Sequence, residues 1–482
     1  MRKIRTILLV LLLSITLVSC NEAASDTDKS SDFTFEELFS SEEAFAHIEA
    51  LTTEEMEGRR AGSEGNQRAT EYIKNHFSSL GLAPAGDEDS YYQWFNQETL
   101  TFTQPATLVL LDEEGEIHKE FTNREDYVLL RRAVSGEGGN FFERTSMDSD
   151  FSLESSITLI TPEDMEGNPT FGNDASIVMG ESMELLYPLI SEYREEIDGL
   201  ILIPHDPISN FTGNPLPMYL MPAFLNLDRD IMDENTPDVM YITRSTYDEI
   251  LSLKDQNYTL QAQGGFTHEE ASVANVIGKY ESAEDTKDTL LLMAHFDHVG
   301  KDSEGSINPG ALDNASGTAV MMEMARTITE ENMQLPFHIE FIAFNGEEDG
   351  LLGAFHYADA MNHDPSDLKV INLDMVGASH VDYLLLDPSD RVADESIYII
   401  MQSIAQERDI EYRLQRNSGG SDHIPFSLVG ADVLLVLDYS HEIFDNHYHN
   451  HYDTLDIIDQ ERLDLLGNIV LETIQRLGVE GE

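Results

Sequence analysis

Histidine and carboxylate side chains in the second half of the chain have the types and spacing of a two-metal hydrolytic site. Each lies where a strand is expected to end or a helix to begin. The residues are His295, Asp313, Glu347, Glu348, Asp374 and His449. Open α/β sheets bind ligands at the carboxyl ends of their strands. The pattern therefore predicts metal-assisted hydrolysis at that edge of a sheet.

The first two candidate ligands along the chain are His295 and Asp313. His295 directly follows the apolar run 290–294, and Asp297 could accept its other ring N–H and fix the tautomer, as the supporting partner of a metal-bound histidine does. Asp313 lies in Gly-Ala-Leu-Asp-Asn-Ala-Ser-Gly, at an expected helix start. It could be a simple N-cap, or a bridging ligand that its small neighbours leave open to close approach.

The next carboxylates follow or interrupt apolar strands. Glu347 and Glu348 come just after the apolar run 337–344, so one could bind metal while the other faces a bound water. The alternative is a solvated loop in a very acidic chain. Asp374 lies inside Ile-Asn-Leu-Asp-Met-Val-Gly, where an ionised carboxylate is costly unless it is paired or metal-bound.

A histidine-rich segment near the C-terminus offers the last ligand. It runs Asn-His-Tyr-His-Asn-His-Tyr-Asp-Thr from residue 446, and it is either a polar surface loop or the source of one ligand. Tyr448 within it is a candidate hydrogen-bond donor to an oxyanion. Upstream, the glycine-rich turn 418–423 could line the cleft or serve only as a turn.

Alternating strands and helices must position these residues. From about residue 274 the sequence indicates strands at 290–294, 337–344, 370–374 and 433–437, and helices at 315–330, 395–407 and 461–477. Two further helices are expected within 41–81. This order predicts an α/β three-layer sandwich with a mostly parallel central sheet. Between 101 and 266, short strand-like runs and a helix at 183–196 predict an inserted, mainly β domain.

The N-terminus reads as a targeting segment rather than as part of the fold. Basic residues precede a short apolar run, and Leu-Val-Ser-Cys ending at Cys20 resembles the lipobox of bacterial lipoproteins. The alternative is an ordinary cleaved signal with an incidental cysteine. Cys20 is the only cysteine, so any metal must be held by histidine and carboxylates. Residues 21–40 would be a flexible tether.

Charge excludes one class of function and suggests a habitat. The chain has 91 acidic and 28 basic residues, with a formal net charge of −63. Nucleic acid binding is not expected, because no basic surface is available for phosphates. Self-repulsion on this scale is screened only by salt, since the Debye length falls from ~30 Å at 0.01 M to ~3 Å at 1 M. We expect a salt-rich habitat.

Six motifs in order carry a family resemblance. They are H-F-D-H, A-L-D-N-A-S-G, G-E-E-D-G-L-L-G, L-D-M-V-G, G-G-S-D-H and Y-H-N-H-Y-D-T. The chain resembles the di-zinc exopeptidases that include aminopeptidase Y, bacterial leucyl aminopeptidases and glutamate carboxypeptidase. The stretch Glu-Gly-Arg-Arg-Ala-Gly, which starts at Glu57, also looks like the N-terminal region of that family.

The resemblance assigns roles to these residues. It implies that Asp313 bridges two zinc ions, that His295 and Asp374 complete one metal site, and that Glu348 and His449 complete the other. Glu347 would be the general base and Tyr448 an oxyanion donor. His449 is preferred to His451 because the family's ligand lies four residues before the Asp of Asp-Thr.

The implied organisation and function follow. The expected regions are a lipoprotein signal (1–20), a tether (21–40), a first catalytic segment (41–105), a protease-associated-like insertion (106–266) and a second catalytic segment (267–482). The implied function is aminopeptidase action on peptides outside the cytoplasm, on a bacterial membrane reached through a lipid on Cys20. Alternatives are a glutaminyl cyclase or carboxypeptidase of the same fold, or a binding lipoprotein without catalysis. The sequence does not indicate an oligomeric state.

Overall fold

The computed structural model describes most of the chain beyond its N-terminus. The described residues are 35, 37–129, 134–135, 144–145, 149–156, 178–179, 200–205, 238–253, 256–388, 396–415 and 420–480. Residues 38–482 form one compact unit. The lipoprotein signal, most of the tether, the helix expected at 183–196 and the start of the turn 418–423 lie outside the described residues.

A mixed sheet forms the centre of this unit. Its main path runs β16-β15-β17-β14-β12-β13-β11-β2-β3, from β16 (Tyr412–Leu414) to β3 (Ile117–Glu120). The strands β1 (Ala83–Pro84) and β7 (Ser149–Ser156) also pair with β11. The central strands β12 (Thr289–His295), β13 (His338–Phe344), β14 (Leu368–Asp374) and β17 (Asp432–Leu437) are mutually parallel. On either side, β15 (Leu384–Pro388) and β11 (Thr259–Tyr280) run antiparallel to their neighbours β17 and β13. The expected mostly parallel centre is confirmed.

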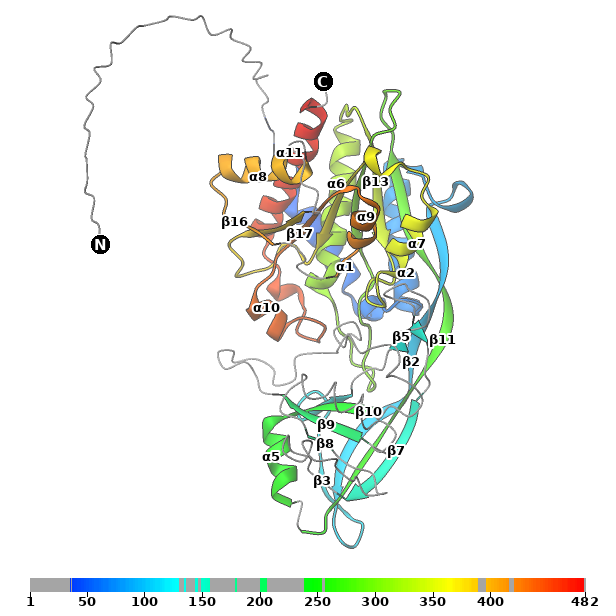
Figure 1. The fold of residues 1–482 in the computed structure, drawn as a ribbon, viewed down its shortest axis with the longest axis vertical. Helices are drawn as coiled ribbons and strands as arrows, with labels where there is room; N and C mark the ends of the chain where they lie inside the picture. Colours follow the sequence, from blue (N-terminus) through cyan, green and yellow to red (C-terminus); the bar gives the residue numbers. More distant parts are fainter. Residues whose placement is uncertain are drawn as a thin grey trace, which may run out of the picture. The chain divides into compact units, whose positions relative to one another are not determined.

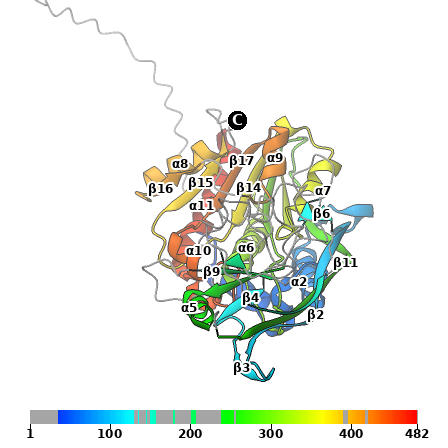
Figure 2. The ribbon, with the colours of Figure 1, turned by 60° about the horizontal axis from the view of Figure 1, so that its bottom comes forward.

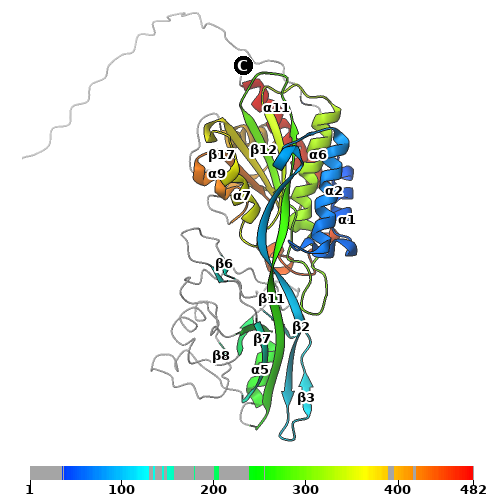
Figure 3. The ribbon, with the colours of Figure 1, turned by 90° about the vertical axis from the view of Figure 1, so that its right-hand side faces the viewer.

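Helices cover both faces of the sheet. One layer holds α1 (Ser41–Leu51), α2 (Glu64–Leu80), α6 (Gly317–Glu330), α8 (Ile397–Glu407) and α11 (Gln460–Glu480), which contact one another (Figure 3). The opposite layer holds α7 (Leu352–Ala360) and α9 (Ile424–Val429). The three-layer α/β sandwich predicted from the sequence is therefore confirmed.

Alternating side chains of the central strands fill both interfaces. Leu291 and Met293 of β12 share a buried apolar cluster with Ala354 of α7 and Phe426 of α9. Leu290 and Leu292, which are equally buried, point to the other face because side chains alternate along a strand. Burial on both faces explains why these strands read as continuous apolar runs.

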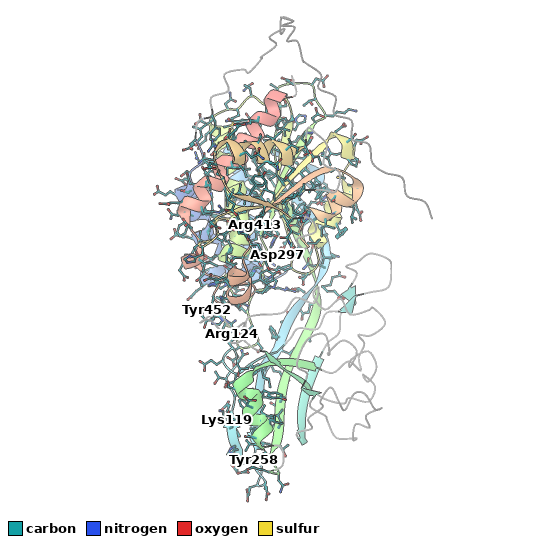
Figure 4. All side chains as sticks on the ribbon, turned by 60° about the vertical axis from the view of Figure 1, so that its left-hand side comes forward. Lys119, Arg124, Tyr258, Asp297, Arg413 and Tyr452 are labelled. Atoms are coloured by element: carbon teal, nitrogen blue, oxygen red, sulfur yellow. The ribbon has the colours of Figure 1, made fainter. Side chains whose placement is uncertain are left out.

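Two long strands connect this sandwich with the inserted region. β2 (Tyr92–Leu111) and β11 pair antiparallel over most of their lengths (Figure 1). The limits expected at 105/106 and 266/267 each fall inside one of these strands. Figure 4 labels Lys119 on β3, which pairs with β2, and Tyr258 just before β11, both away from Asp297 in the sandwich.

Within the inserted region, the described residues form a second small sheet. Its strands are β4 (Tyr127–Leu129), β10 (Asp238–Thr243), β9 (Leu200–His205) and β8 (Val178–Met179), in that order. Helix α5 (Arg244–Leu253) packs on β9 and β10 (Figure 2). Leu108, Tyr127, Ile242 and Leu260 form a separate apolar cluster here.

The expected elements of the sandwich are present with small shifts. The helix expected at 315–330 begins two residues later, as α6 at Gly317, because Ala311–Ser316 form a wide turn. The reason is local: Asn314 uses its side chain to bind Leu373 O and Gly317 N, so the backbone there does not follow a regular helix. Across the described residues of the chain, no helix has the length and apolarity required to cross a membrane.

Candidate metal centre

Parallel strands place three of the predicted residues at one edge of the sheet. His295 is the last residue of β12, Asp374 is the last residue of β14, and Glu347 lies three residues beyond the end of β13. Because these strands are neighbours and parallel, their carboxyl ends meet. The structure gathers His295, Glu347 and Asp374 so that one ligand atom of each lies within 4.8 Å of the others.

A second group of four side chains meets beside the first. Its members are His298, Asp313, Glu348 and His449, with ligand atoms again within 4.8 Å of one another. His449 Nε2 lies 2.9 Å from Asp313 Oδ2 and 3.1 Å from Glu348 Oε2. The four residues are buried.

Asp313 faces both groups with different oxygen atoms. Its Oδ1 lies 3.6 Å from His295 Nε2, while its Oδ2 lies 2.9 Å from His449 Nε2. His295 Nε2 is also 3.4 Å from Asp374 Oδ1. This is the arrangement that a bridging carboxylate requires, and it matches the grouping that the sequence implied.

The hydrogen-bonding state of the carboxylates fits a cation. Asp313 Oδ2, Glu348 Oε2 and Asp374 Oδ1 are buried and accept no hydrogen bond. Buried acceptors are normally satisfied, and an unpaired buried charge is costly. Imidazole nitrogens and carboxylate oxygens are the ligands that zinc accepts in the absence of thiolates. The residues therefore fit two bound zinc ions.

The paired glutamates have opposite electrostatic environments. Burial raises the pKa of Glu347 well above its usual value; Glu348 and Asp422 raise it further, and His295 opposes them. Burial also acts to raise the pKa of Glu348, but His449 and His298 outweigh it and hold that pKa well below the usual value. Glu348 is thus fixed as an anion, while Glu347 is a carboxyl group that accepts a proton readily.

Asp297 supports the site in a different way from the one expected. His295 Nδ1 lies 3.2 Å from the main-chain oxygen of Asp297 and 3.9 Å from its carboxylate. The carboxylate instead accepts hydrogen bonds from the backbone N–H groups of Glu347, at 3.2 Å, and Glu348, at 3.3 Å. Asp297 therefore orients the tautomer of His295 through its carbonyl and holds the Glu347–Glu348 turn through its side chain.

Two more polar side chains hold ligands in the same manner. Asp453 accepts hydrogen bonds from the N–H groups of Leu312, at 2.7 Å, and Asp313, at 2.9 Å. Ser421 donates to Asp374 Oδ2 at 2.7 Å and accepts from Asn372 at the same distance. The glycine-rich turn thus reaches the metal centre through its serine.

A fully buried arginine ties the ligand-bearing loop to the N-terminal segment. Arg59 donates to four backbone carbonyls, those of Leu51, Phe296, Pro309 and Gly310, at 2.7–2.8 Å. Burial lowers its pKa to about 10, with Asp453 and Asp313 opposing the shift. The guanidinium therefore remains a cation beside an acidic site. In the sequence, the stretch Glu-Gly-Arg-Arg-Ala-Gly is notable only for its family resemblance, which gives no indication of this bracing role of Arg59.

The C-terminal histidine segment contributes His449 rather than His451. His451 belongs to neither ligand group, and its surroundings are Arg124 and Asp302. Tyr448 stacks on the ring of His449 with centroids 3.7 Å apart. Burial raises its pKa well above the usual value, with Asp313 and Glu348 adding to the shift, so the phenol keeps its proton.

Two residues near the ligands were not among the predicted site residues. His298 is the final histidine of His-Phe-Asp-His, three positions after His295, which is the signal that could have identified it. Asp422 is fully buried, neither of its carboxylate oxygens has a hydrogen-bond partner, and burial raises its pKa well above the usual value. It lies in the Gly-Gly-Ser-Asp-His turn.

Fold and site together define an α/β peptidase fold with a binuclear metal centre. Residues 275–474 match the peptidase family M28. The likeness to di-zinc exopeptidases that the six motifs predict is confirmed over this region.

Relatives agree with this assignment. Aminopeptidase YwaD of Bacillus subtilis is 33% identical over 196 residues, covering 39% of this chain and 40% of that protein. Leupeptin-inactivating enzyme 1 of Streptomyces exfoliatus is 28% identical over 234 residues, covering 44% and 50%. The chain thus spans half or less of the length of these curated relatives.

Solved structures share the fold over nearly the whole chain. An aminopeptidase from Aneurinibacillus sp. strain AM-1 superposes with a TM-score of 0.62 at 20% identity, covering 91% of this chain and 94% of that one. A zinc aminopeptidase from Bacillus subtilis gives 0.61 at 20% identity, covering 92% and 96%. The fold therefore extends beyond the region that the family match covers.

Proposed function

We propose that this chain is a zinc-dependent exopeptidase, specifically an aminopeptidase that removes N-terminal residues from peptides. The observation that carries the proposal is the pair of ligand groups joined by Asp313, with the buried Glu347 next to His295 and Asp374. The names of the relatives, which include a zinc aminopeptidase, support the metal and the reaction class.

The residues suggest a simple division of labour. Two zinc ions held by these ligands would polarise the scissile carbonyl and lower the pKa of a water molecule. Glu347 takes a proton from the attacking water as the C–O bond forms. The same carboxyl group then gives that proton to the leaving amine as the C–N bond breaks, so Glu347 ends in its initial state.

The surroundings favour a substrate with a free amino terminus. Asp422 is a buried carboxyl group whose charge helps to raise the pKa of Glu347, and Asp374 in turn helps to raise the pKa of Asp422. A substrate ammonium group would find buried carboxyl groups here that can accept its hydrogen bonds, and its positive charge would favour their ionised forms. Tyr448, which keeps its proton, would donate a hydrogen bond to the developing oxyanion.

A panel of aminoacyl p-nitroanilides tests the proposal, with and without chelator. We expect hydrolysis by the wild type, loss on chelation and recovery with zinc. Glu347→Gln should lower kcat by ~10²–10⁴-fold while the zinc content is unchanged. N-acetylated substrates should not be cleaved.

Other outcomes of this panel identify the alternatives. Cyclisation of N-terminal glutamine would indicate a glutaminyl cyclase, and release of C-terminal residues a carboxypeptidase. Bound metal without any turnover would indicate a binding protein. Hydrolysis that survives both chelation and Glu347→Gln would contradict the mechanism.

We also propose that the chain is anchored to a bacterial membrane on its extracytoplasmic side. The support is the basic and apolar N-terminus ending at Cys20, the single cysteine. Expression in a bacterial host with labelled fatty acid should label the wild type but not Cys20→Ser. Equal partition of both proteins into detergent would contradict the anchor.

Two further proposals concern the rest of the chain. The excess of acidic residues suits a salt-rich medium, and full stability in dilute buffer would contradict this. The inserted region is a protease-associated-like domain that limits access of large substrates. It contacts the loop between β12 and α6 through Arg124, which pairs with Asp302 and donates to Ser306 O at 3.0 Å. If Arg124→Ala leaves the preference for peptide length unchanged, that role is wrong.

A further inference from the structure

His298 lies where a further ligand of the second group would have to be. It is fully buried on the loop that follows β12, and its Nδ1 is 3.0 Å from Glu348 Oε1 and 3.8 Å from Asp313 Oδ2. His449 approaches the same two carboxylates, at 2.9 and 3.1 Å. Two imidazoles thus approach the same two carboxylates. Asp313 Oδ2 and Glu348 Oε2 accept no hydrogen bond, whereas Glu348 Oε1 lies within hydrogen-bonding distance of His298 Nδ1.

We propose that His298 is a fourth protein ligand of the metal ion held by Asp313, Glu348 and His449. The inference rests on the proposed two-zinc function. Zinc–ligand bonds of 2.0–2.1 Å in a tetrahedron place neighbouring ligand atoms about 3.3–3.4 Å apart. The four contacts between an imidazole and a carboxylate in this group, 2.9–3.8 Å, bracket that value.

The main chain around His298 is held in place by the N-terminal segment. The His298 N–H donates to Arg59 O at 3.4 Å, and the Gly300 N–H donates to Gly58 O at 3.1 Å. A Cβ on Gly58 would come within 2.4 Å of Asn308 O, and its φ of +69° also favours glycine. The position of His298 is therefore fixed by the packing of two distant segments.

The side chain of Arg59 braces both ends of the same loop. Its guanidinium binds Phe296 O, just before His298, and the carbonyls of Pro309 and Gly310, just before Asp313. On the other side, the Asp297 carboxylate holds the N–H of Glu348. The three segments that supply His298, Asp313 and Glu348 are thus braced against one another, which is the preorganisation that a ligand set needs.

A fourth ligand makes the two metal sites unequal. The group with His298 offers four protein ligands, as closed structural zinc sites do. The other site has His295, Asp374 and the shared Asp313, which leaves positions for water and substrate. The first site therefore retains its metal more strongly, and the second exchanges metal and meets the substrate.

The competing role for His298 is that of a hydrogen-bond donor to Glu348 Oε1. Two variants separate the roles. His298→Ala removes both functions, whereas His298→Asn places an amide N–H donor near the position of Nδ1 and can replace a hydrogen bond. His451→Asn is the matched control, because His451 lies on the neighbouring segment and outside both ligand groups.

The experiment measures zinc per chain by elemental analysis after equilibration of the full-length protein with a graded series of chelator. We expect the wild type and His451→Asn to release zinc in two separate steps. In both His298 variants the tighter step should weaken by at least the ~10–100-fold typical for loss of a supporting partner. Cobalt-substituted protein should show a changed visible spectrum in both variants.

The outcomes distinguish this inference from the proposed function. Wild-type retention in His298→Asn would mean that a hydrogen bond suffices, and unchanged retention in His298→Ala would mean that the residue does not act on the metal; either result overturns the inference alone. A wild type that binds no zinc contradicts the proposed function instead. Melting curves of the metal-free variants test whether both proteins fold. If His298→Ala does not fold, the zinc retention and the cobalt spectrum of His298→Asn decide whether His298 binds the metal.

Discussion

Two groups of closely packed histidines in this chain have opposite surroundings. His47 of α1 and His76 of α2 pack edge to face, with ring centroids 4.7 Å apart. Their hydrogen-bond partners are neutral: His47 Nδ1 lies 2.7 Å from the Tyr72 hydroxyl, and His76 Nε2 lies 3.0 Å from Met322 O. The histidines of the metal centre instead lie within 4 Å of carboxylate oxygens.

The pKa values show what this difference does. Burial lowers the pKa of His47 to about 4, and the neighbouring His76 adds to the shift. Burial also acts to lower the pKa of His449, but Glu348 and Asp313 raise it to about 9. A buried imidazole is thus no sign of a metal site by itself. Carboxylates around the imidazole do indicate a metal site, because their charge requires either protons or a cation.

Removal of the shared carboxylate should have the largest effect. Asp313→Asn leaves His295 and His449 without the carboxylate that joins them, so each keeps only the carboxylate of its own group, Asp374 or Glu348. We expect zinc content to fall to one ion per chain or none. Hydrolysis should fall by more than the ~10²–10⁴-fold that a general base alone contributes. Elemental analysis and p-nitroanilide kinetics measure both.

The matched control for this substitution is Asp382→Asn, which changes an exposed aspartate in the same region of the chain. It should behave as the wild type in both measurements. If Asp313→Asn still bound two zinc ions, the bridging role of Asp313 would be wrong, and the distinction between the two histidine groups would need another cause.

A smaller effect is expected at Asp297, which supports ligands without belonging to either ligand group. Asp297→Asn keeps the main-chain oxygen near His295 but weakens the two hydrogen bonds that hold the Glu347–Glu348 turn. Zinc retention should weaken by ~10–100-fold. Chelator titration of the variant against Asp382→Asn tests this. Retention equal to that of the control would show that the backbone holds the turn unaided.

Sequence patterns predicted where the candidate ligands that follow strands would come together. His295, Glu347 and Asp374 come at or just after the ends of parallel strands, so knowledge of the strands alone brings them together. The apolar runs are long and uninterrupted, which made those strands evident. The same reasoning predicted the three-layer sandwich.

Other features depend on contacts between distant segments and could not be read from local patterns. The placement of His298 requires Gly58 and Arg59, more than 200 positions earlier in the numbering. The Asp297 carboxylate accepts a hydrogen bond from the Glu347–Glu348 turn, while its backbone carbonyl lies near the imidazole of His295. Neither contact is evident from the local sequence. The polar, interrupted sequences of β2 and β11 gave no sign of two such long paired strands.

The smallest effect concerns the other histidine group and the pH dependence of stability. The pKa of His47 is about 4 in the folded chain and its ordinary value is 6.5. Between pH 4 and pH 6.5 the unfolded chain therefore binds a proton on this residue that the folded chain does not. The stabilising contribution of the neutral imidazole is therefore complete above pH 6.5 and is lost as the pH falls toward 4. With a discount for partial exposure, the loss amounts to roughly 1–2 kcal/mol.

Substitution of His47 should remove this component while leaving the metal centre intact. His47→Asn should therefore show a flatter decline of unfolding free energy between pH 6.5 and 4 than the wild type, measured by denaturant titration at each pH. The exposed His380→Asn should follow the wild type. Added zinc should stabilise all three proteins equally, since His47 has no carboxylate among its hydrogen-bond partners. If His47→Asn were no longer stabilised by zinc, His47 would be coupled to the metal centre, which would contradict the separation of the two histidine groups.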